Sequence, residues 1–290
     1  MHASFFKHYF NDVEKITFSY DDLELAYKRL ASIMKGEKSI STLPTDIFTK
    51  VFRAERAIIK EANNAYITNR VAIAYAKAIY ESLDEKEAME FCKLFNMVVE
   101  KKQGIYYVDL KSYVNNMPSS QDYKLFYLHV SDGFVQLDEK KFFRFLQEAI
   151  RAKLSLIYEQ ERDERAKEFA EQLKEFIPKP KVKFNFEKPP CIESILTQLY
   201  AHENLSHYSR WVLAVYLINT GMQTDEIKKL YENLPDYNEK ITTYQLEHIK
   251  RRQYKMPSCE KMLMYGLRKE ECPCNKGLID NPLAYKKKKD

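Results

Sequence analysis

The sequence predicts a mainly α-helical protein, in which a helical N-terminal body with a small α/β insert is linked to an all-helical C-terminal domain. Three observations carry this prediction. Apolar residues recur at the 3.6-residue period of amphipathic helices through most of the chain. Only 6 of the 290 residues are glycine, so few tight hairpins are expected. A proline- and lysine-rich stretch at residues 176–190 interrupts the helical pattern and divides the chain in two.

The first part of the body is predicted to be helical. An apolar stripe from Leu23 to Met34 predicts the first helix, which Asp21 and Asp22 cap at its start and Gly36 ends. Apolar residues near a helical period predict three further helices, over residues 46–63, 64–83 and 85–98.

The α/β insert is expected at about residues 104–140. Three β-rich segments lie there, at residues 105–108, 124–130 and 134–137. Ser-Asp-Gly at residues 131–133 predicts a hairpin between the second and the third. Asp138 then caps a helix that begins at Glu139 and runs towards the charged stretch 159–167.

A linker follows the body. Four prolines within residues 176–190 exclude a helix there, and the lysines between them keep the segment solvated. We therefore place the body at residues 1–178, the linker at 179–189 and a second domain at 190–290. Helices are expected at residues 192–201 and 209–219, with Gly221 ending the second and Thr224 capping the next.

Four of the five cysteines lie in this second domain, namely Cys191, Cys259, Cys272 and Cys274. Thiolates bind zinc or iron–sulfur clusters. Zinc ribbons usually present C-x2-C pairs, which this chain lacks, so the scattered ligands favour a cubane cluster over zinc and leave zinc and unliganded thiols as alternatives. The fifth cysteine, Cys92, is expected to be a buried apolar residue on a helix.

Side chains that bind nucleotides lie between the first two of these cysteines. His207 and Arg210 are one helical turn apart, and an imidazole with a guanidinium can bind phosphate or triphosphate. A second group offers a stacking ring, an amide, an imidazole and two cations, namely Tyr244, Gln245, His248, Arg251 and Arg252. The alternative is a solvated helix face with a basic end.

Several function classes are excluded by the sequence. We find no glycine-rich phosphate loop, no nucleophile elbow and no carboxylate pair of the kind that holds two Mg²⁺ ions in polymerases, so no catalytic residues are predicted. No apolar run approaches the roughly 20 residues of a membrane span, and no secretory signal is recognised at the start. A reducing, cytoplasmic location without a membrane partner is therefore expected, and the net charge of +5 permits a polyanionic partner.

At these residues the chain resembles the large, non-catalytic subunit of archaeal and eukaryotic DNA primase. The resemblance rests on Pro189-Pro190-Cys191, on His207 followed by Arg210, and on further motifs in the family's order at residues 238–248, 256–259, 265–267 and 281–285. Many archaeal members have a cysteine directly after Tyr-Gly-Leu, where this chain has Arg268, so Cys272 and Cys274 remain as the last two ligands.

The resemblance implies a role in DNA replication. It implies a [4Fe–4S] cluster held by the four cysteines, and a body that docks the catalytic primase small subunit through the α/β region. The second domain would bind the single-stranded DNA template, a nucleoside triphosphate and the 5′ end of the RNA/DNA primer. His207 and Arg210 would contact the triphosphate, and Tyr244, Gln245 and His248 the nucleotide or template. The expected location is the archaeal cytoplasm, in association with the nucleoid.

Two other interpretations are consistent with the sequence. The first is a zinc-stapled nucleic-acid-binding protein without a role in primer synthesis. The second is a helical interaction scaffold whose cysteines are incidental. Measurement of bound metal and of acid-labile sulfide distinguishes an iron–sulfur protein from both alternatives.

Overall fold

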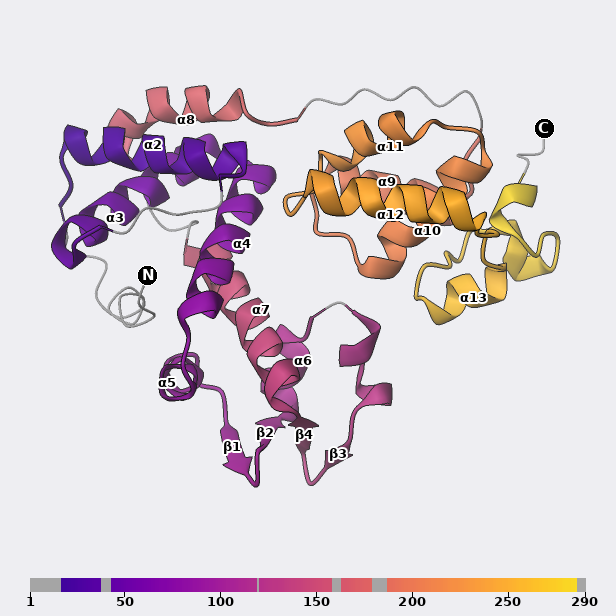
Figure 1. Ribbon diagram of the computed structural model, residues 1–290, viewed down its shortest axis with the longest axis horizontal. Coiled ribbons are helices and arrows are strands. Elements are labelled where there is room, and N and C mark those ends of the chain that lie inside the picture. The colour runs from indigo at the N-terminus through magenta and orange to yellow at the C-terminus, as the bar shows by residue number, and fades with distance from the viewer. Residues whose placement is uncertain (1–16, 38–42, 119, 158–162, 179–186, 286–290) are drawn as a thin grey trace. The chain divides into compact units, whose positions relative to one another are not determined.

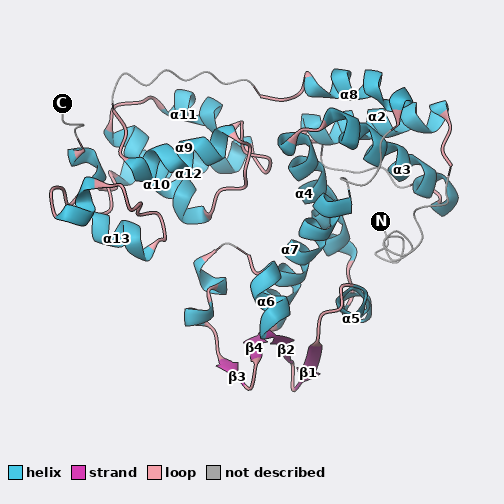
Figure 2. Ribbon diagram, turned by 180° about the vertical axis from the view of Figure 1, so that it is seen from behind, coloured by secondary structure: helices cyan, strands magenta, loops and turns pink. Residues whose placement is uncertain are grey.

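The chain divides into two compact units, Met1–Ile177 and Pro178–Asp290, each with its own apolar core (Figure 1). The computed structural model describes residues 17–37, 43–118, 120–157, 163–178 and 187–285. Most of the predicted linker and part of the charged stretch at residues 159–167 lie outside the described residues. The fold class is as predicted, since helices dominate both units and the strands are confined to one small sheet (Figure 2).

The first unit begins with helices that pack against one another. Their bounds are α2 (Tyr20–Lys35), α3 (Thr45–Ala62), α4 (Ala65–Ser82) and α5 (Glu85–Leu94). The hydroxyl of Ser19 accepts a hydrogen bond from the backbone N–H of Asp22, whose carboxylate accepts the Ser19 N–H in return. This capping box starts α2, so Asp22 acts from inside the first turn. Gly36, with φ of 80°, ends α2 as predicted.

A buried polar network ties α2, α3 and α4 together. Arg29 donates through Nε to Glu55 Oε1 at 2.8 Å and through Nη2 to the Tyr75 hydroxyl at 3.0 Å. That hydroxyl donates to the other Glu55 oxygen at 2.6 Å. Each of the three side chains forms hydrogen bonds with the other two. These bonds offset the desolvation cost of burying Arg29 and Glu55 and hold the three helices in one arrangement.

The α/β insert is an antiparallel sheet with the strand order β1-β2-β4-β3. Its strands are β1 (Val99–Lys102), β2 (Ile105–Asp109), β3 (Val130–Ser131) and β4 (Phe134–Leu137). Tyr106 and Val108 of β2 pair with Leu137 and Val135 of β4, and these four side chains form the buried face. The Tyr106 ring stacks on Phe142 with centroids 3.9 Å apart, which anchors the sheet to the next helix.

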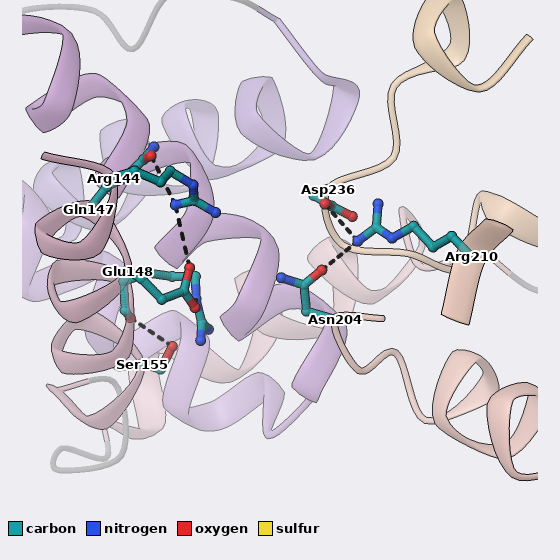
Figure 3. A network of polar contacts seen from close by, with 8 residues as sticks. Arg144, Gln147, Glu148, Ser155, Asn204, Arg210 and Asp236 are labelled. Atoms are coloured by element: carbon teal, nitrogen blue, oxygen red, sulfur yellow. Dashed lines mark hydrogen bonds and ion pairs between the residues drawn. The ribbon is translucent and has the colours of Figure 1, made fainter. Parts of the chain in front are cut away.

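That helix is α7 (Glu139–Ile157), which begins after Asp138 as predicted and lies beside α4 in both ribbon views (Figures 1 and 2). One side of α7 carries a row of polar contacts. Glu148 pairs with Arg144 at 3.5 Å and with Arg151 at 2.6 Å, and Ser155 donates to the backbone of Arg151 (Figure 3). The remaining helices of the unit are α6 (Leu110–Asn116), η4 (Glu164–Ala166) and α8 (Lys167–Lys174).

Two predictions for the insert were wrong. The segment at residues 124–130 is not a strand: it contains the 3₁₀ helix η3 (Leu125–Tyr127), preceded by η2 (Gln121–Tyr123), and only Val130–Ser131 pairs with β4. The helix expected to reach residue 98 ends at Leu94, because Asn96 adopts the left-handed conformation and the chain then enters β1. The insert therefore begins at residue 99 rather than at 104.

The second unit is all-helical apart from its loops. Its helices are α9 (Pro190–Tyr200), α10 (His207–Asn219), α11 (Thr224–Tyr231), α12 (Glu239–Arg252) and α13 (Cys259–Met264), with 3₁₀ turns η5 (Pro273–Lys276) and η6 (Pro282–Ala284). α10 starts two residues before the predicted position, with Ser206 as its N-cap. The N-cap of α11 is Gln223 rather than Thr224. The carboxylate of Glu226 accepts the backbone N–H of Gln223 at 3.1 Å. Within the described ranges, no helix combines the length and apolarity that crossing a bilayer requires.

Candidate nucleotide-binding cavity and cysteine cluster

A cavity of about 220 Å³ lies between α10 and α12 in the second unit. Five of the seven residues proposed from sequence to bind nucleotides line it, namely His207, Arg210, Tyr244, Gln245 and His248. The helical period explains this, because residues three to four positions apart share one helix face and the two helices turn these faces towards each other. The wall is completed by Trp211, Ala214, Tyr231, Thr242, Leu246, Ile249 and Tyr254.

Arg210 is held on one side of this cavity by fixed partners. Its Nη2 donates to the side chains of Asn204 at 2.6 Å and Asp236 at 2.8 Å (Figure 3). Its Nε donates to the backbone carbonyl of Leu205 at 3.0 Å. Asn204 and Asp236 come from the loops before α10 and α12, so two loops set the direction of one guanidinium. These bonds use Nε and Nη2, so within the described residues the Nη1 edge is left for a ligand.

The N-terminus of α10 adds to the positive character of this side. Ser206 caps the helix by accepting the N–H of Ser209, and His207 is the first helical residue, exposed to solvent. The aligned peptide dipoles place partial positive charge at a helix N-terminus, where anions bind. His207 and Arg210 therefore surround a position that suits a phosphate group.

The lining of the cavity is also rich in aromatic rings. Trp211 and Tyr254 meet edge to face with centroids 5.8 Å apart, and the Tyr254 ring lies 5.9 Å from that of His248. Tyr244, which is 66% exposed, lies nearly parallel to the His248 ring. Exposed and half-buried rings of this kind accept a nucleobase by stacking.

Sequence reasoning missed Trp211 and Tyr254. Trp211 follows Arg210 directly and is the only tryptophan of the chain, which was the available signal. Tyr254 lies beyond the end of α12, and the left-handed Gln253, with φ of 48°, turns the chain so that its ring reaches the cavity. No pattern of residue types marks that turn.

Arg251 and Arg252 are exposed and lie outside the cavity. A nitrogen of the Arg251 guanidinium approaches Nδ1 of His248 at 3.5 Å. Both arginines occupy the last turn of α12, where cations also stabilise the negative end of the helix dipole. The structure therefore gives these two side chains a local role at the helix end and does not place them with the other five.

The four cysteines of the second unit line one very small cavity, and all four are buried. Cys191 lies in the first turn of α9 and Cys259 begins α13, while Cys272 and Cys274 flank Pro273 at the start of η5. Their loops are well anchored: the N–H of Cys259 donates to the carbonyl of Asp280 at 2.7 Å. Segments far apart in the sequence thus bring their thiols together.

The electrostatics of this cluster raise the pKa of the Cys191, Cys259 and Cys272 thiols. Burial, and then the neighbouring thiol of Cys272, raises the pKa of Cys191 to about 12. Burial and the Cys274 thiol do the same to Cys259, whose pKa is also raised to about 12. In contrast, burial alone accounts for the raised pKa of Cys92, which lies among apolar side chains of the first unit as predicted. A bound cation would reverse this balance by favouring the thiolate forms.

The donor set can be compared with the group that the resemblance implies. Four buried sulfurs without competing oxygen ligands match the ligand preference of iron–sulfur clusters and of zinc. In the part of the chain that the structure describes, no three histidine, cysteine or acidic side chains meet closely enough to hold a single metal ion. The chemistry of the four sulfur donors nevertheless fits a thiolate-bound group.

Comparison with known proteins bears on both sites. Residues 185–288 match a family model that describes the C-terminal domain of the large subunit of eukaryotic and archaeal DNA primase. A DNA primase large subunit of Methanosarcina mazei is 28% identical over 258 residues, which cover 81% of this chain and 69% of that protein. That of Methanosarcina barkeri is 26% identical over 317 residues, covering 96% of this chain and 76% of its own length. The second unit thus matches the DNA primase large-subunit family, and the chain is similar to archaeal members of that family over most of its length.

The region that matches the primase family model holds the complete candidate site, since the cavity and the four cysteines all fall within residues 185–288. A primase large subunit of Methanopyrus kandleri has higher identity, 37%, but over 131 residues, or 40% of this chain and 31% of that protein. The longer matches show that the first unit also shares the family's sequence.

Proposed function

We propose that this chain is the regulatory, non-catalytic large subunit of a DNA primase, and that its second unit holds the initiating nucleotide or the 5′-triphosphate end of the primer. Similarity to this family supports the role in primase. The observation that carries the finer proposal is the cavity between α10 and α12, whose lining combines basic and aromatic side chains.

The two kinds of side chain fit the two ends of a nucleotide. Arg210 and His207 at the α10 N-terminus bind the phosphates through charge-assisted hydrogen bonds. Tyr244 and Trp211 provide rings for stacking on a base, either of the nucleotide or of the single-stranded template. Gln245 supplies an amide for hydrogen bonds to a base edge.

This division of labour matches the main obstacle to starting a primer. Two free nucleotides must be held on a template before any duplex stabilises them, at a large cost in translational and rotational entropy. A nucleotide-binding unit attached to the catalytic subunit raises the effective concentration of the first nucleotide near the active site. It binds the 5′ end and leaves the chemistry to the small subunit.

Arg210→Met tests the phosphate side of the cavity. A hydrogen bond to a charged group contributes about 1.5–3 kcal/mol, so we expect dinucleotide formation by the two-subunit enzyme to fall roughly 10- to 150-fold at subsaturating nucleotide. Extension of a preformed, 5′-hydroxyl primer should be unaffected. The measurement is the initial rate of each reaction with radiolabelled nucleotides.

Two further variants control this experiment. Asp236→Asn combined with Arg210→Met removes the carboxylate that would otherwise lose its partner, so a persistent defect reflects the missing guanidinium and not a destabilised loop. Lys229→Met removes an exposed cation on α11 that does not line the cavity and should initiate normally. Equal loss of initiation in Lys229→Met and Arg210→Met would contradict the proposal.

We also propose that the α/β insert contributes to docking of the catalytic small subunit. Phe126 is 89% exposed and its neighbour Tyr127 is 52% exposed, although both are large apolar rings. The two rings meet edge to face, 5.2 Å apart, in η3. Aromatic side chains held out in this way are typical anchors of a protein interface.

Phe126→Asp should therefore weaken association with the small subunit, with an expected loss of at least about 2 kcal/mol if the ring is an anchor, or roughly 30-fold in affinity. Co-purification and isothermal titration measure the effect. Leu156→Asp is the matched control, because Leu156 is also an exposed apolar residue, on α7 outside the insert. Unchanged affinity of Phe126→Asp would remove this part of the insert from the interface.

We propose, finally, that Cys191, Cys259, Cys272 and Cys274 hold a [4Fe–4S] cluster that fixes the fold of the second unit. The support is the four buried thiols around one cavity and their origin in three separate segments. When bound, the cluster would link α9, α13 and the η5 turn through metal–sulfur bonds. Zinc bound by the same thiols is the alternative that metal and sulfide analysis would reveal.

A further inference from the structure

Arg268 lies at the cysteine cluster and has an unusual hydrogen-bonding state. It lines the same small cavity as the four cysteines. Its Nη2 donates to the carbonyl oxygen of Cys274 at 3.2 Å, which ties the guanidinium to the turn that carries two of the sulfurs. Its Nε is buried and, within the described part of the chain, has no hydrogen-bond partner.

A buried guanidinium N–H without an acceptor destabilises the fold. Its presence here therefore indicates that a hydrogen-bond acceptor binds next to Nε of Arg268. Leaving a buried donor unpaired costs about 1–3 kcal/mol, and more for a charged group. The residues that line the cavity with Arg268 offer sulfur, proline rings and Met262, along with one further cation, Lys269. The acceptor that Nε lacks is thus expected among the sulfurs when they are deprotonated and metal-bound.

The positive charge of Arg268 also indicates a role next to metal-bound thiolates. Thiolates that ligate iron leave the site with excess negative charge in a buried environment, which an adjacent cation offsets. An arginine is suited to this place because its guanidinium stays protonated and presents N–H groups in a rigid plane. Its contact with the Cys274 carbonyl fixes that plane against the cavity wall.

We propose that Arg268 is a positioning residue of the iron–sulfur site, which donates its Nε–H to the sulfur-rich centre and offsets its negative charge. This inference rests on the proposed cluster. A positive charge next to a cluster stabilises its reduced, more negative state, so Arg268 raises the reduction potential. The hydrogen bond to sulfur acts in the same direction.

The test compares full-length wild type with Arg268→Met, Arg268→Lys and Lys276→Met, all purified without oxygen. Lys276→Met is the charge-matched control, because Lys276 is an exposed cation of the η5 turn. Iron and acid-labile sulfide are measured first, and the reduction potential is then titrated with dithionite and mediators while the reduced cluster is followed by electron paramagnetic resonance.

We expect Arg268→Met to shift the reduced-to-oxidised ratio at fixed potential at least tenfold towards oxidised, which is about 59 mV for a one-electron couple. Arg268→Lys keeps the charge but loses Nε–H, and should show a smaller shift in the same direction. Lys276→Met should match wild type.

Equal potentials in wild type and Arg268→Met would overturn the inference. If Arg268→Met does not retain iron, Arg268→Lys decides: a potential equal to that of wild type overturns the inference, and a lowered potential supports it. Failure of the proposed cluster has a different signature, since wild type would then contain zinc or no metal and no labile sulfide.

Discussion

Removal of residues 190–290 is expected to abolish primer initiation and to leave extension of a preformed primer largely intact. The cavity and the cysteine cluster lie wholly in the second unit, whereas the proposed docking residues lie in the first. Because each unit has its own apolar core, the shortened chain retains every buried side chain of the first core. It should therefore fold and bind the small subunit, but it would hold no initiating nucleotide.

The contrast between initiation and extension makes this experiment specific. An extension reaction starts from a duplex end, which already positions the primer without help from a 5′-binding unit. Initiation lacks that duplex and depends on the nucleotide held by the second unit. Equal loss of both activities would mean that the deletion damages the catalytic subunit or its docking, and it would contradict the proposed role.

Supplying the second unit as a separate chain provides a further control. Covalent attachment through a short linker gives an effective concentration on the order of millimolar, so micromolar second unit added in trans should restore only a small part of initiation. Full restoration at that concentration would indicate a strong direct contact between the second unit and the small subunit. No restoration at any concentration would show that attachment itself is essential.

How much of the fold could be predicted depended on whether local signals and packing agreed. The helices were found because their apolar period coincides with the face they bury. The segment at residues 124–130 failed because its β-forming residues are not used for pairing: Phe126 is exposed to solvent, and the Tyr113 hydroxyl donates to the backbone carbonyl of Tyr123 at 2.6 Å and holds the preceding turn. Propensity for strands reflects the packing of side chains on a sheet, and in this segment Leu125 and Leu128 pack against the core of the first unit without pairing as a strand.

β1 was missed for a different reason. Apolar spacing alone extends the helix before it through residue 98, although Asn96 is a residue that readily takes the left-handed conformation that ends helices. Gln103 and Gly104, both with positive φ, then form the tight turn between β1 and β2. The charged residues of β1 show no apolar alternation that would identify its partner strand.

The candidate site was predictable to the extent that residue type reveals chemistry. His207, Arg210 and Tyr244 are of the types that bind phosphates and bases, and the pairing of α10 with α12 places them around one cavity. The partners that orient them were not predictable, because Asn204 and Asp236 approach Arg210 only through the conformation of two loops. Long-range contacts of this kind carry no sequence period.

Cys259→Ala is expected to cause the largest loss of stability among single substitutions in the second unit. It would remove one of four ligands and leave three buried thiols around an incomplete site. Binding of a structural metal contributes about 10–16 kcal/mol of apparent free energy in zinc-finger peptides, so loss of a comparable group is of the same size as the roughly 5–15 kcal/mol by which domains are usually stable. The iron content should fall, and the second unit should unfold or become far less stable.

The matched control is Cys92→Ala. Cys92 is buried like Cys259, but it belongs to the core of the first unit, whereas the four proposed ligands belong to the second, so its loss should cost on the order of 1 kcal/mol and leave the iron content unchanged. The only tryptophan of the chain, Trp211, lies in the second unit, and its fluorescence therefore reports unfolding of that unit alone. Urea titration followed at Trp211 should shift strongly for Cys259→Ala and stay unchanged for Cys92→Ala.

Removal of the metal from the wild-type protein distinguishes a cluster that fixes the fold from cysteines that are incidental to folding. If the thiols hold a cluster that fixes the fold, chelation with an oxidant present should bleach the visible absorption and change Trp211 emission together, because the cluster links the segments that complete the second core. The change should be absent in the first unit, whose core contains none of the four ligands. A chelated chain that keeps its Trp211 emission and its urea midpoint would show that the cysteines are incidental to folding, as expected of an interaction scaffold.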